Sequence, residues 1–191
     1  MEFMRRAALV EAAVAEIGGA GSLDVTVTQI AKRAGMSSAL AHHYFGGKDQ
    51  MFLAAMRHIL QQYSAEVARA LAGCAAPRDR LAALIGANFA PAFFDAQTAG
   101  AWLQFYVHAQ ANPDAARLLR VYHRRLYSNL CHALRPHVAT PHAAARTLGA
   151  LVDGVYLRAV LDGGWSGDPG QEVLTAARAL IASEKTASHV L

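Results

Sequence analysis

The sequence predicts an all-α fold of about nine helices, divided into a small N-terminal domain, residues 1–48, and a larger C-terminal domain, residues 49–191. Apolar residues recur every three or four positions, and no segment alternates as a strand would. Three prolines follow capping side chains, in Asn112-Pro113, Thr140-Pro141 and Asp168-Pro169, which is typical of helix starts. With 54% hydrophobic residues, a chain of 191 residues can bury a sizeable core.

The first predicted helix carries its apolar residues on one face: Leu9, Val10, Ala13, Val14 and Ile17. The glycine-rich stretch 18–21 is predicted to end this helix, because glycine is a poor helix former. Arg5 and Arg6 are then expected just before the helix, where they are either merely solvated or in contact with phosphates.

Residues 26–48 predict two short helices joined by a tight turn. Thr26 and Gln29 have the spacing of a capping box, which fixes the start of the first helix. Gly35 supplies the backbone freedom needed at the turn. Ser37 is the predicted N-cap of a second helix that runs through Tyr44. This arrangement is typical of a helix-turn-helix unit, whose second helix enters the major groove of double-stranded DNA.

The second helix of this motif carries side chains suited to contact rather than burial. Its small, apolar and hydrogen-bonding groups match thymine methyls, purine acceptors and phosphate oxygens. Tyr44 and Lys48 are expected to hold phosphates without reading sequence. An ordinary helix pair of a bundle is the alternative interpretation. The predicted DNA-binding residues are Thr26, Ser37, Ser38, Ala39, Leu40, His42, His43, Tyr44 and Lys48.

The formal net charge of +4 does not by itself indicate nucleic acid, because the excess lies outside the motif. Residues 1–50 carry five basic and five acidic side chains: Arg5, Arg6, Lys32, Arg33 and Lys48 against Glu2, Glu11, Glu16, Asp24 and Asp49. DNA affinity therefore depends on where the charges of this segment sit.

The rest of the chain continues the helical period. A long helix follows the motif, with its apolar stripe at Phe52, Met56, Ile59, Tyr63, Val67 and Leu71. Further helices are predicted over residues 78–95, bent at Pro91, and over residues 98–110, 113–135, 141–161 and 169–182. A short connector, residues 163–167, predicts that the last two helices are antiparallel neighbours.

The last two predicted helices carry apolar faces that suit a two-fold homodimer. Completion of the monomer core is the alternative use of these faces. The residues concerned are Leu148, Leu151, Val152, Val155 and Ala159 on one helix and Val173, Leu174, Ala177, Leu180 and Ile181 on the other.

Several other classes of protein are disfavoured by the sequence. The apolar stretch 81–94 is interrupted by Gly86, Asn88 and Pro91, so no membrane span is expected, and no leader for export is recognised. Cys74 and Cys131 lack metal or redox spacing, which fits a cytoplasmic location. No catalytic motif is present among the nine histidines, so we predict no enzyme activity, no metal and no cofactor.

The C-terminal domain contains a candidate ligand site. Trp102, Phe105 and Tyr106 lie on adjacent turns of one predicted helix, and Asp153 stands one turn before Tyr156 in an apolar segment of another. A carboxylate among apolar neighbours needs a partner. Arg158 or Arg124 is the ordinary choice, and a cationic ligand held by aromatic faces is the alternative, worth about 0.5 to 2 kcal/mol in cation–π attraction.

The residues of the N-terminal domain resemble the TetR family of transcriptional regulators. The resemblance rests on Thr26-Val27, Ile30-Ala31, Ala34 to Ser37, His43 to Phe45, Lys48 and Met51-Phe52, together with one helix before the motif and a long helix after it. Ala41 departs from the larger aliphatic residue usual in that family, and Gly46-Gly47 is a looser connector. The resemblance implies a dimeric, ligand-responsive repressor with no enzyme activity.

The C-terminal domain is similar to the BetI repressors, a TetR group that governs glycine betaine synthesis from choline. The similar segments are 101–106, 124–130 and 148–159. The resemblance implies a repressor of betaine synthesis genes that senses choline or a related quaternary ammonium. The ligand residues expected from the residue pattern, and not carried over from the family, are Trp102, Phe105, Tyr106, Asp153 and Tyr156. A TetR-type regulator of other genes with an unrelated small hydrophobic or cationic ligand is the alternative.

Overall fold

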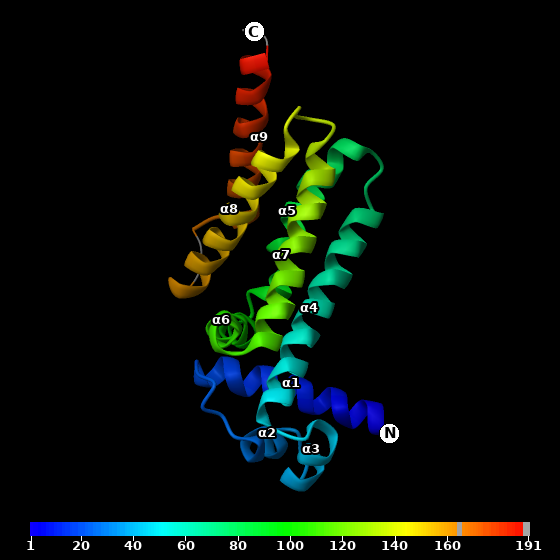
Figure 1. Cartoon of the computed structure of the whole chain (residues 1–191), viewed down its shortest axis with the longest axis vertical. Coiled ribbons are helices and arrows are strands. Elements are labelled where there is room, and N and C mark those ends of the chain that lie inside the picture. Colours follow the sequence, from blue (N-terminus) through cyan, green and yellow to red (C-terminus); the bar gives the residue numbers. More distant parts are fainter. Residues whose placement is uncertain (164–165, 189–191) are drawn as a thin grey trace. The chain divides into compact units, whose positions relative to one another are not determined.

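The computed structural model describes residues 1–163 and 166–188, with side chains up to residue 184. Over these residues the chain forms nine α-helices and two 3₁₀ turns and no strand, which confirms the predicted all-α class. Trp165, in the predicted connector of residues 163–167, lies outside the described residues. The helices, shown in Figure 1, are α1 (Glu2–Ala20), α2 (Val27–Arg33), α3 (Ser38–Phe45), α4 (Lys48–Ala72), α5 (Arg80–Asn88), α6 (Ala96–Ala111), α7 (Pro113–Leu134), α8 (Pro141–Leu161) and α9 (Pro169–Ser188).

The chain divides into two compact units. The first unit comprises Met1–Gln62 and Phe94–Arg120, and so contains α1, α2, α3 and α6. The second comprises Tyr63–Phe93 and the chain from Val121 onward, and so contains α5, α8 and α9. Helices α4 and α7 each contribute residues to both units. The predicted functional division after residue 48 stays a prediction.

Helix α1 begins earlier than the sequence predicts and ends within the predicted glycine-rich stretch 18–21. Arg5 and Arg6 lie inside it rather than before it, because the helix begins at Glu2. It also continues through Gly18 and Gly19 and ends at Gly21, whose left-handed φ of 58° closes the helix. The predicted apolar face is confirmed, since all five of its residues are buried.

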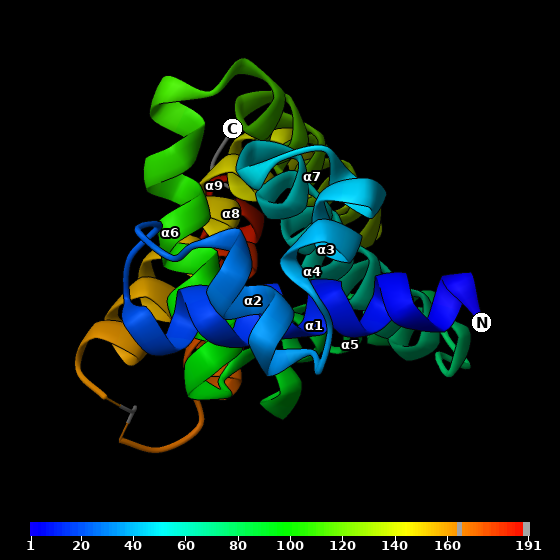
Figure 2. The same cartoon turned by 90° about the horizontal axis from the view of Figure 1, so that it is seen from below.

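The reason for glycine near the end of α1 is the close approach of α6, which α1 crosses in Figure 2. A Cβ atom placed on Gly18 would lie 1.8 Å from the carbonyl oxygen of Gln97. A Cβ atom on Gly100 would lie 2.8 Å from the carbonyl oxygen of Gly18. Gln104 Nε2 also donates a hydrogen bond to the carbonyl oxygen of Gly21, at 2.8 Å. The two backbones therefore touch directly, which only glycine permits.

The second unit is built around α8 and α9, which pack side by side, with α5 against α9 (Figure 1). The predicted helix over residues 78–95 is wrong in its extent. The segment forms a 3₁₀ turn (Pro77–Asp79), α5 and a second 3₁₀ turn (Pro91–Phe93), so α5 ends at Asn88, before Pro91. Buried Asn88 is satisfied there, because its amide donates to the carbonyl oxygen of Leu84 and its oxygen accepts from Tyr63.

Two of the three predicted Xaa-Pro caps form as expected. The Asn112 side chain accepts from the backbone amides of residues 114 and 115, and the Asp168 side chain accepts from those of residues 170 and 171. Thr140 makes no capping hydrogen bond. Its hydroxyl donates instead to Glu184 Oε1 at 3.3 Å, which ties the start of α8 to α9.

Most of the apolar surface predicted to meet a second chain is used within this one. Seven of the ten residues are buried: Leu148, Val152, Val155, Ala159, Val173, Leu174 and Ala177. Leu151, Leu180 and Ile181 remain partly exposed. Leu157 and Leu161, which the prediction omitted, are 43% and 67% exposed on α8. No described helix is long and apolar enough to cross a membrane.

Candidate nucleic-acid interface and effector site

The helix-turn-helix motif forms with the predicted local chemistry. The Thr26 hydroxyl accepts from the amide of Gln29, and the Gln29 side chain accepts from the amide of Thr26, which completes the capping box. Gly35 turns the chain at a φ of +67°. Ser37 caps α3 by accepting from the amide of Leu40 at 3.2 Å. The hydroxyls of both caps are thus already engaged at the N-termini of the two helices.

Helix α3 buries one narrow face and exposes the rest. Ala41 and Phe45 are its buried residues, and Ala41 is fully enclosed despite its small size. The predicted contact residues lie on the other side: Ala39, His42 and His43 are exposed, whereas Ser38, Leu40 and Tyr44 are partly exposed. The arrangement presents the predicted base-reading surface outward, as a recognition helix requires.

Two cations flank α3 and rest on aromatic rings. The Arg6 guanidinium lies 5.0 Å from the ring centroid of Phe45, and the ammonium of Lys48 lies 5.4 Å from that of Phe52. Arg33, in contrast, is paired with Glu16 at 2.6 Å. From the sequence, Arg6 was expected before the helix, either solvated or in contact with phosphates. Its distance in the chain from Phe45 gave no signal for this contact.

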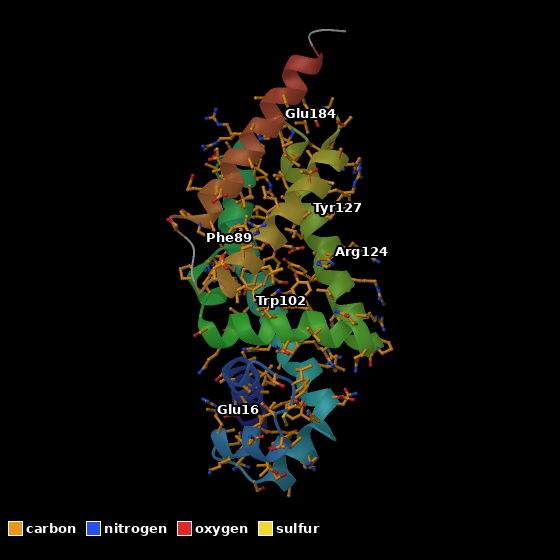
Figure 3. The ribbon with its side chains drawn as sticks, turned by 90° about the vertical axis from the view of Figure 1, so that its left-hand side faces the viewer. Glu16, Phe89, Trp102, Arg124, Tyr127 and Glu184 are labelled. Carbon is orange, nitrogen blue, oxygen red and sulfur yellow. The ribbon has the colours of Figure 1, made fainter. Side chains whose placement is uncertain are left out.

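Of the three aromatic residues predicted on α6, Trp102 contacts the other two, within the first unit. Trp102, which Figure 3 labels, is buried, and its ring lies 6.4 Å from that of Phe105 and 5.5 Å from that of Tyr106, both edge-on. The same helix carries His108, whose ring lies edge-on to Phe52 at 6.3 Å. Within the first unit, helix α6 therefore contacts both α1 and, through His108, the start of α4.

The other two predicted ligand residues, Asp153 and Tyr156, lie on α8 in the second unit. The Asp153 carboxylate accepts from the Tyr122 hydroxyl at 3.2 Å through Oδ1, and its Oδ2 lies 3.5 Å from His123 Nε2. The sequence suggested Arg158 or Arg124 as the ion-pair partner, whereas the structure provides Tyr122 and His123. Arg124 lies next to His123 on α7 and is exposed (Figure 3).

The tyrosines of the second unit form one cluster with Asp153. Tyr63 is edge-on to Tyr122 at 5.4 Å and to Phe93 at 6.0 Å, and the Tyr156 hydroxyl donates to the carbonyl oxygen of Phe93 at 2.8 Å. Burial raises the pKa of Tyr63 and of Tyr156 well above the ordinary value. The negative charge of Asp153 raises the pKa of Tyr63 further, whereas its hydrogen bond with Asn88 opposes the shift. We name Tyr63, Phe93, Tyr122, His123, Asp153 and Tyr156 the Asp153 cluster.

Sequence reasoning missed four of the six residues of this cluster as ligand candidates: Tyr63, Phe93, Tyr122 and His123. Tyr63 was assigned only to the apolar stripe of the long helix. The proximity of Tyr63, Tyr122 and Asp153 follows from the packing of three helices, α4, α7 and α8, which periodicity within one helix does not reveal. Among the described residues, no group of three or more His, Cys, Asp or Glu side chains is placed to hold a metal ion.

A helix-turn-helix motif whose second helix exposes most of its side chains, followed over the described residues by further helices and no strand, defines a DNA-binding regulator of the TetR type. Residues 9–55 match the family described as bacterial regulatory proteins, tetR family, and residues 77–183 match the BetI-type transcriptional repressor, C-terminal. The chain therefore belongs to the BetI-type repressors of the TetR family.

Individual relatives agree with this assignment. The HTH-type transcriptional regulator BetI of Brucella anthropi is 50% identical over 163 residues, which cover 84% of each chain. The regulator of the same name from Agrobacterium fabrum is 45% identical over 161 residues, 83% of this chain and 78% of that protein. The predictions of a transcriptional repressor and of a protein that is not an enzyme are confirmed by these relatives.

Solved structures show the same fold. A TetR-family transcriptional regulator from Rhodococcus sp. superposes with a TM-score of 0.80 at 21% identity, over 93% of this chain and 99% of that one. A transcriptional regulator from Saccharomonospora viridis in complex with choline superposes with a TM-score of 0.75 at 21% identity, over 93% of this chain and 95% of that one.

Proposed function

We propose that this repressor binds a near-palindromic operator as a homodimer in the cytoplasm and responds to choline or a related quaternary ammonium, controlling betaine synthesis genes. The observation that carries the effector class is the Asp153 cluster, in which a carboxylate lies among tyrosine rings. A charge in such surroundings attracts a cation, and ring faces favour one that carries methyl groups.

The recognition surface supports distinct roles for the predicted DNA-binding residues. Ser38, Ala39, Leu40, His42 and His43 lie on the outward face of α3 and are proposed to meet base edges. Tyr44 and Lys48 are proposed to hold phosphates, and Thr26 and Ser37 to fix the two helix starts beside the backbone. In the dimer, two heads about 34 to 36 Å apart would read successive major grooves on one face of the duplex.

The proposed homodimer uses α8 and α9. Because the larger part of their apolar faces is buried within the chain, the contact would be made by the residues left at the surface: Leu151, Leu157, Leu161, Leu180 and Ile181. Exposed leucines separated by four positions, as Leu157 and Leu161 are, form a continuous strip on one side of a helix. Such a strip suits an isologous contact with its own copy.

The connection of α6 to the head supports a mechanism for the response. A shift of α6 is proposed to pass directly to α1, because the two helices touch through backbone atoms at Gly18 and Gly100. The hydrogen bond from Gln104 to Gly21 joins them as well. The effector is proposed to contact the aromatic side chains of α6, which are Trp102, Phe105 and Tyr106. Effector binding is proposed to move α6 and α4 and so to change the spacing of the two DNA-binding heads. A coupling free energy of about 1 to 3 kcal/mol between effector binding and DNA binding would weaken DNA binding about 5- to 150-fold.

On α8, Asp153 and Tyr156 are proposed to supply charge and a ring for the effector. The BetI-type family match and the choline held by the Saccharomonospora viridis protein support a quaternary ammonium. A TetR-type regulator of other genes, with an unrelated hydrophobic or cationic ligand, is the second candidate. A neutral apolar effector would make no use of the Asp153 charge, which favours the cationic choice.

The test combines calorimetry and gel-shift titration of the full-length protein. Choline, betaine aldehyde and glycine betaine are titrated in turn, and the protein is then titrated onto a fragment of DNA from upstream of its gene, with and without each compound. The matched variant is Asp153→Asn, which keeps the shape of the side chain and removes its charge. We expect choline to bind and to weaken the shifted band, and the variant to lose at least about tenfold in choline affinity while its affinity for the DNA fragment is retained. Equal choline affinity of both proteins contradicts the proposed role of Asp153.

A further inference from the structure

Cys131 lies beside an imidazole and a phenol where α7 meets the first turn of α8, within the second unit. Its Sγ lies 3.6 Å from Nδ1 of His142. The hydroxyl of Tyr127, which lies one turn before Cys131 on α7 and is labelled in Figure 3, is 2.9 Å from the same nitrogen. We propose that Cys131 is a redox-sensitive site of this protein, at which a small hydroperoxide oxidises the thiol to a sulfenic acid.

The side chains around the Cys131 sulfur favour its anionic form. In the tautomer that carries its proton on Nε2, the His142 imidazole can accept the thiol proton at Nδ1. The hydrogen bond with Cys131 raises the pKa of Tyr127, because the phenol donates to the sulfur, and the negative charge of a thiolate adds to this shift. Arg146, one turn further along α8, contributes a positive charge that opposes the shift. A base, a donor and a cation around one sulfur are the surroundings in which protein thiols react as nucleophiles.

The oxidation is a two-electron step between Cys131 and a hydroperoxide, ROOH. The thiol proton passes to His142, and the thiolate sulfur attacks the terminal oxygen of the peroxide. An S–O bond forms as the O–O bond breaks, and the leaving RO⁻ takes the proton from the His142 imidazolium. The sulfur is thereby oxidised to Cys–SOH, and the hydroperoxide is reduced to ROH.

The site suits a small oxidant better than a bulky reagent or a metal ion. Cys131 is only 6% exposed, whereas the neighbouring His142 is exposed, so a molecule close to the size of water has the easiest access to the sulfur. Sulfur and imidazole nitrogen also bind zinc, but a zinc site takes three or four such ligands. No third His, Cys, Asp or Glu joins them in the part of the chain that the structure describes, and the charge of Arg146 repels a cation.

The other cysteine, Cys74, provides a comparison within the same molecule. It is more exposed than Cys131, and it lines a groove together with Glu66, Arg69 and Asp79. The Cys74 thiol donates to the carbonyl oxygen of Ala70 at 3.4 Å, and Arg69 is paired with Glu66. The carboxylates of this groove oppose a negative charge on the sulfur. Exposure and local chemistry therefore predict opposite orders of oxidation for the two thiols.

The test measures the oxidation of both cysteines in the intact, reduced protein. Hydrogen peroxide is added for increasing times and removed with catalase. The protein is then unfolded in dimedone, which traps sulfenic acids, and the remaining thiols are alkylated with N-ethylmaleimide. Peptide mass spectrometry gives a separate rate for Cys131 and for Cys74.

The variant His142→Asn removes the base from an exposed position, and circular dichroism checks its fold. The matched control is His132→Asn, an exposed histidine next to Cys131 on α7, because adjacent side chains on a helix do not face each other. Tyr127→Phe removes the phenol donor and decides the question if His142→Asn does not fold.

We expect Cys131 to be oxidised at least about tenfold faster than Cys74. His142→Asn is expected to slow Cys131 at least about tenfold and to leave Cys74 unchanged, since positioned proton transfer contributes about 10²- to 10⁴-fold. Tyr127→Phe is expected to slow Cys131 about threefold, the size of one hydrogen bond, and His132→Asn to keep the wild-type rate.

Three results overturn the inference. The first is oxidation of Cys74 as fast as Cys131 in the wild type. The second is a Cys131 rate in the deciding variant that equals the wild-type rate. The third is an equal slowing of Cys131 in the His132→Asn control.

Discussion

The contact between α1 and α6 predicts opposite outcomes for the same substitution at two adjacent glycines. In Gly18→Ala the new Cβ atom would lie 1.8 Å from the carbonyl oxygen of Gln97 and 2.6 Å from its Cα atom. Both neighbours are backbone atoms, which cannot turn aside as the end of a side chain can. In Gly19→Ala the new Cβ atom has no atom from outside the neighbouring backbone of its own helix within 4 Å.

The magnitudes follow from this geometry. To restore an ordinary contact of 3.4 Å, the two helices must separate by about 1.6 Å, which also strains the hydrogen bond from Gln104 to Gly21. Overpacking of this kind lowers the unfolding free energy by about 3 kcal/mol or more. The better helix propensity of alanine offsets about 1 kcal/mol of this loss. For Gly19→Ala the gain of up to about 1 kcal/mol stands alone.

The assay is thermal unfolding followed by circular dichroism, at one protein concentration for all variants because the Tm of the proposed dimer would depend on concentration. We expect Gly18→Ala to lower the Tm by about 5 to 10 °C and Gly19→Ala to raise it by about 2 to 4 °C, since 1 kcal/mol corresponds to about 2 to 4 °C in a domain of this size. If both variants moved the Tm in the same direction by similar amounts, the reasoning about backbone contact would be refuted.

Three further predictions concern caps, phenols and charge. Thr26→Ala is expected to cost about 1 kcal/mol in chemical unfolding because it removes an N-cap, whereas Thr140→Ala, where no capping bond forms, costs less than half of that. Burial raises the pKa of Tyr63 in the folded protein above its unfolded value of 10.0. The stabilisation that comes from keeping this phenol neutral is therefore complete below pH 10 and is lost as the pH rises above 10. Tyr63→Phe is expected to reduce the alkaline decline of the unfolding free energy by up to about 1.4 kcal/mol per pH unit. Lys48→Ala is expected to weaken binding to all operator variants alike and to reduce the salt slope of log K by about 0.9, whereas Ser38→Ala changes which variant is preferred; equal effects of both variants would contradict these roles.

The local features of the fold were predictable because their causes are local. The capping box at Thr26 and Gln29, the turn at Gly35 and the N-cap at Ser37 each depend on residues within four positions of one another. The caps at Asn112 and Asp168 follow the same rule. The exposed residues of α3 were predictable too. Most side chains of this short helix are small or polar, so few of them can contribute to a hydrophobic core.

The errors arise where a distant segment decides. The stretch 18–21 ends α1 as predicted, but nothing in the sequence indicated that α6 requires a residue without a side chain at position 18. Thr140 predicted a cap, yet its hydroxyl meets Glu184, 44 positions along the chain. Asp153 was expected to pair with an arginine, and the packing of α7 against α8 brings it Tyr122 and His123 instead. The expected dimer surface was overestimated because the same residues fill the monomer core.

The charges of the head, taken with its contacts, limit how DNA can be bound. Five basic and five acidic side chains leave residues 1–50 neutral, and Arg33 is neutralised by Glu16. At the flanks of α3, Arg6 and Lys48 each lie over an aromatic ring. We expect a formally neutral head to gain little from counterion release and so to bind non-specific DNA weakly. We then expect base contacts along the proposed recognition helix to supply a larger part of the total binding free energy than in a strongly basic head.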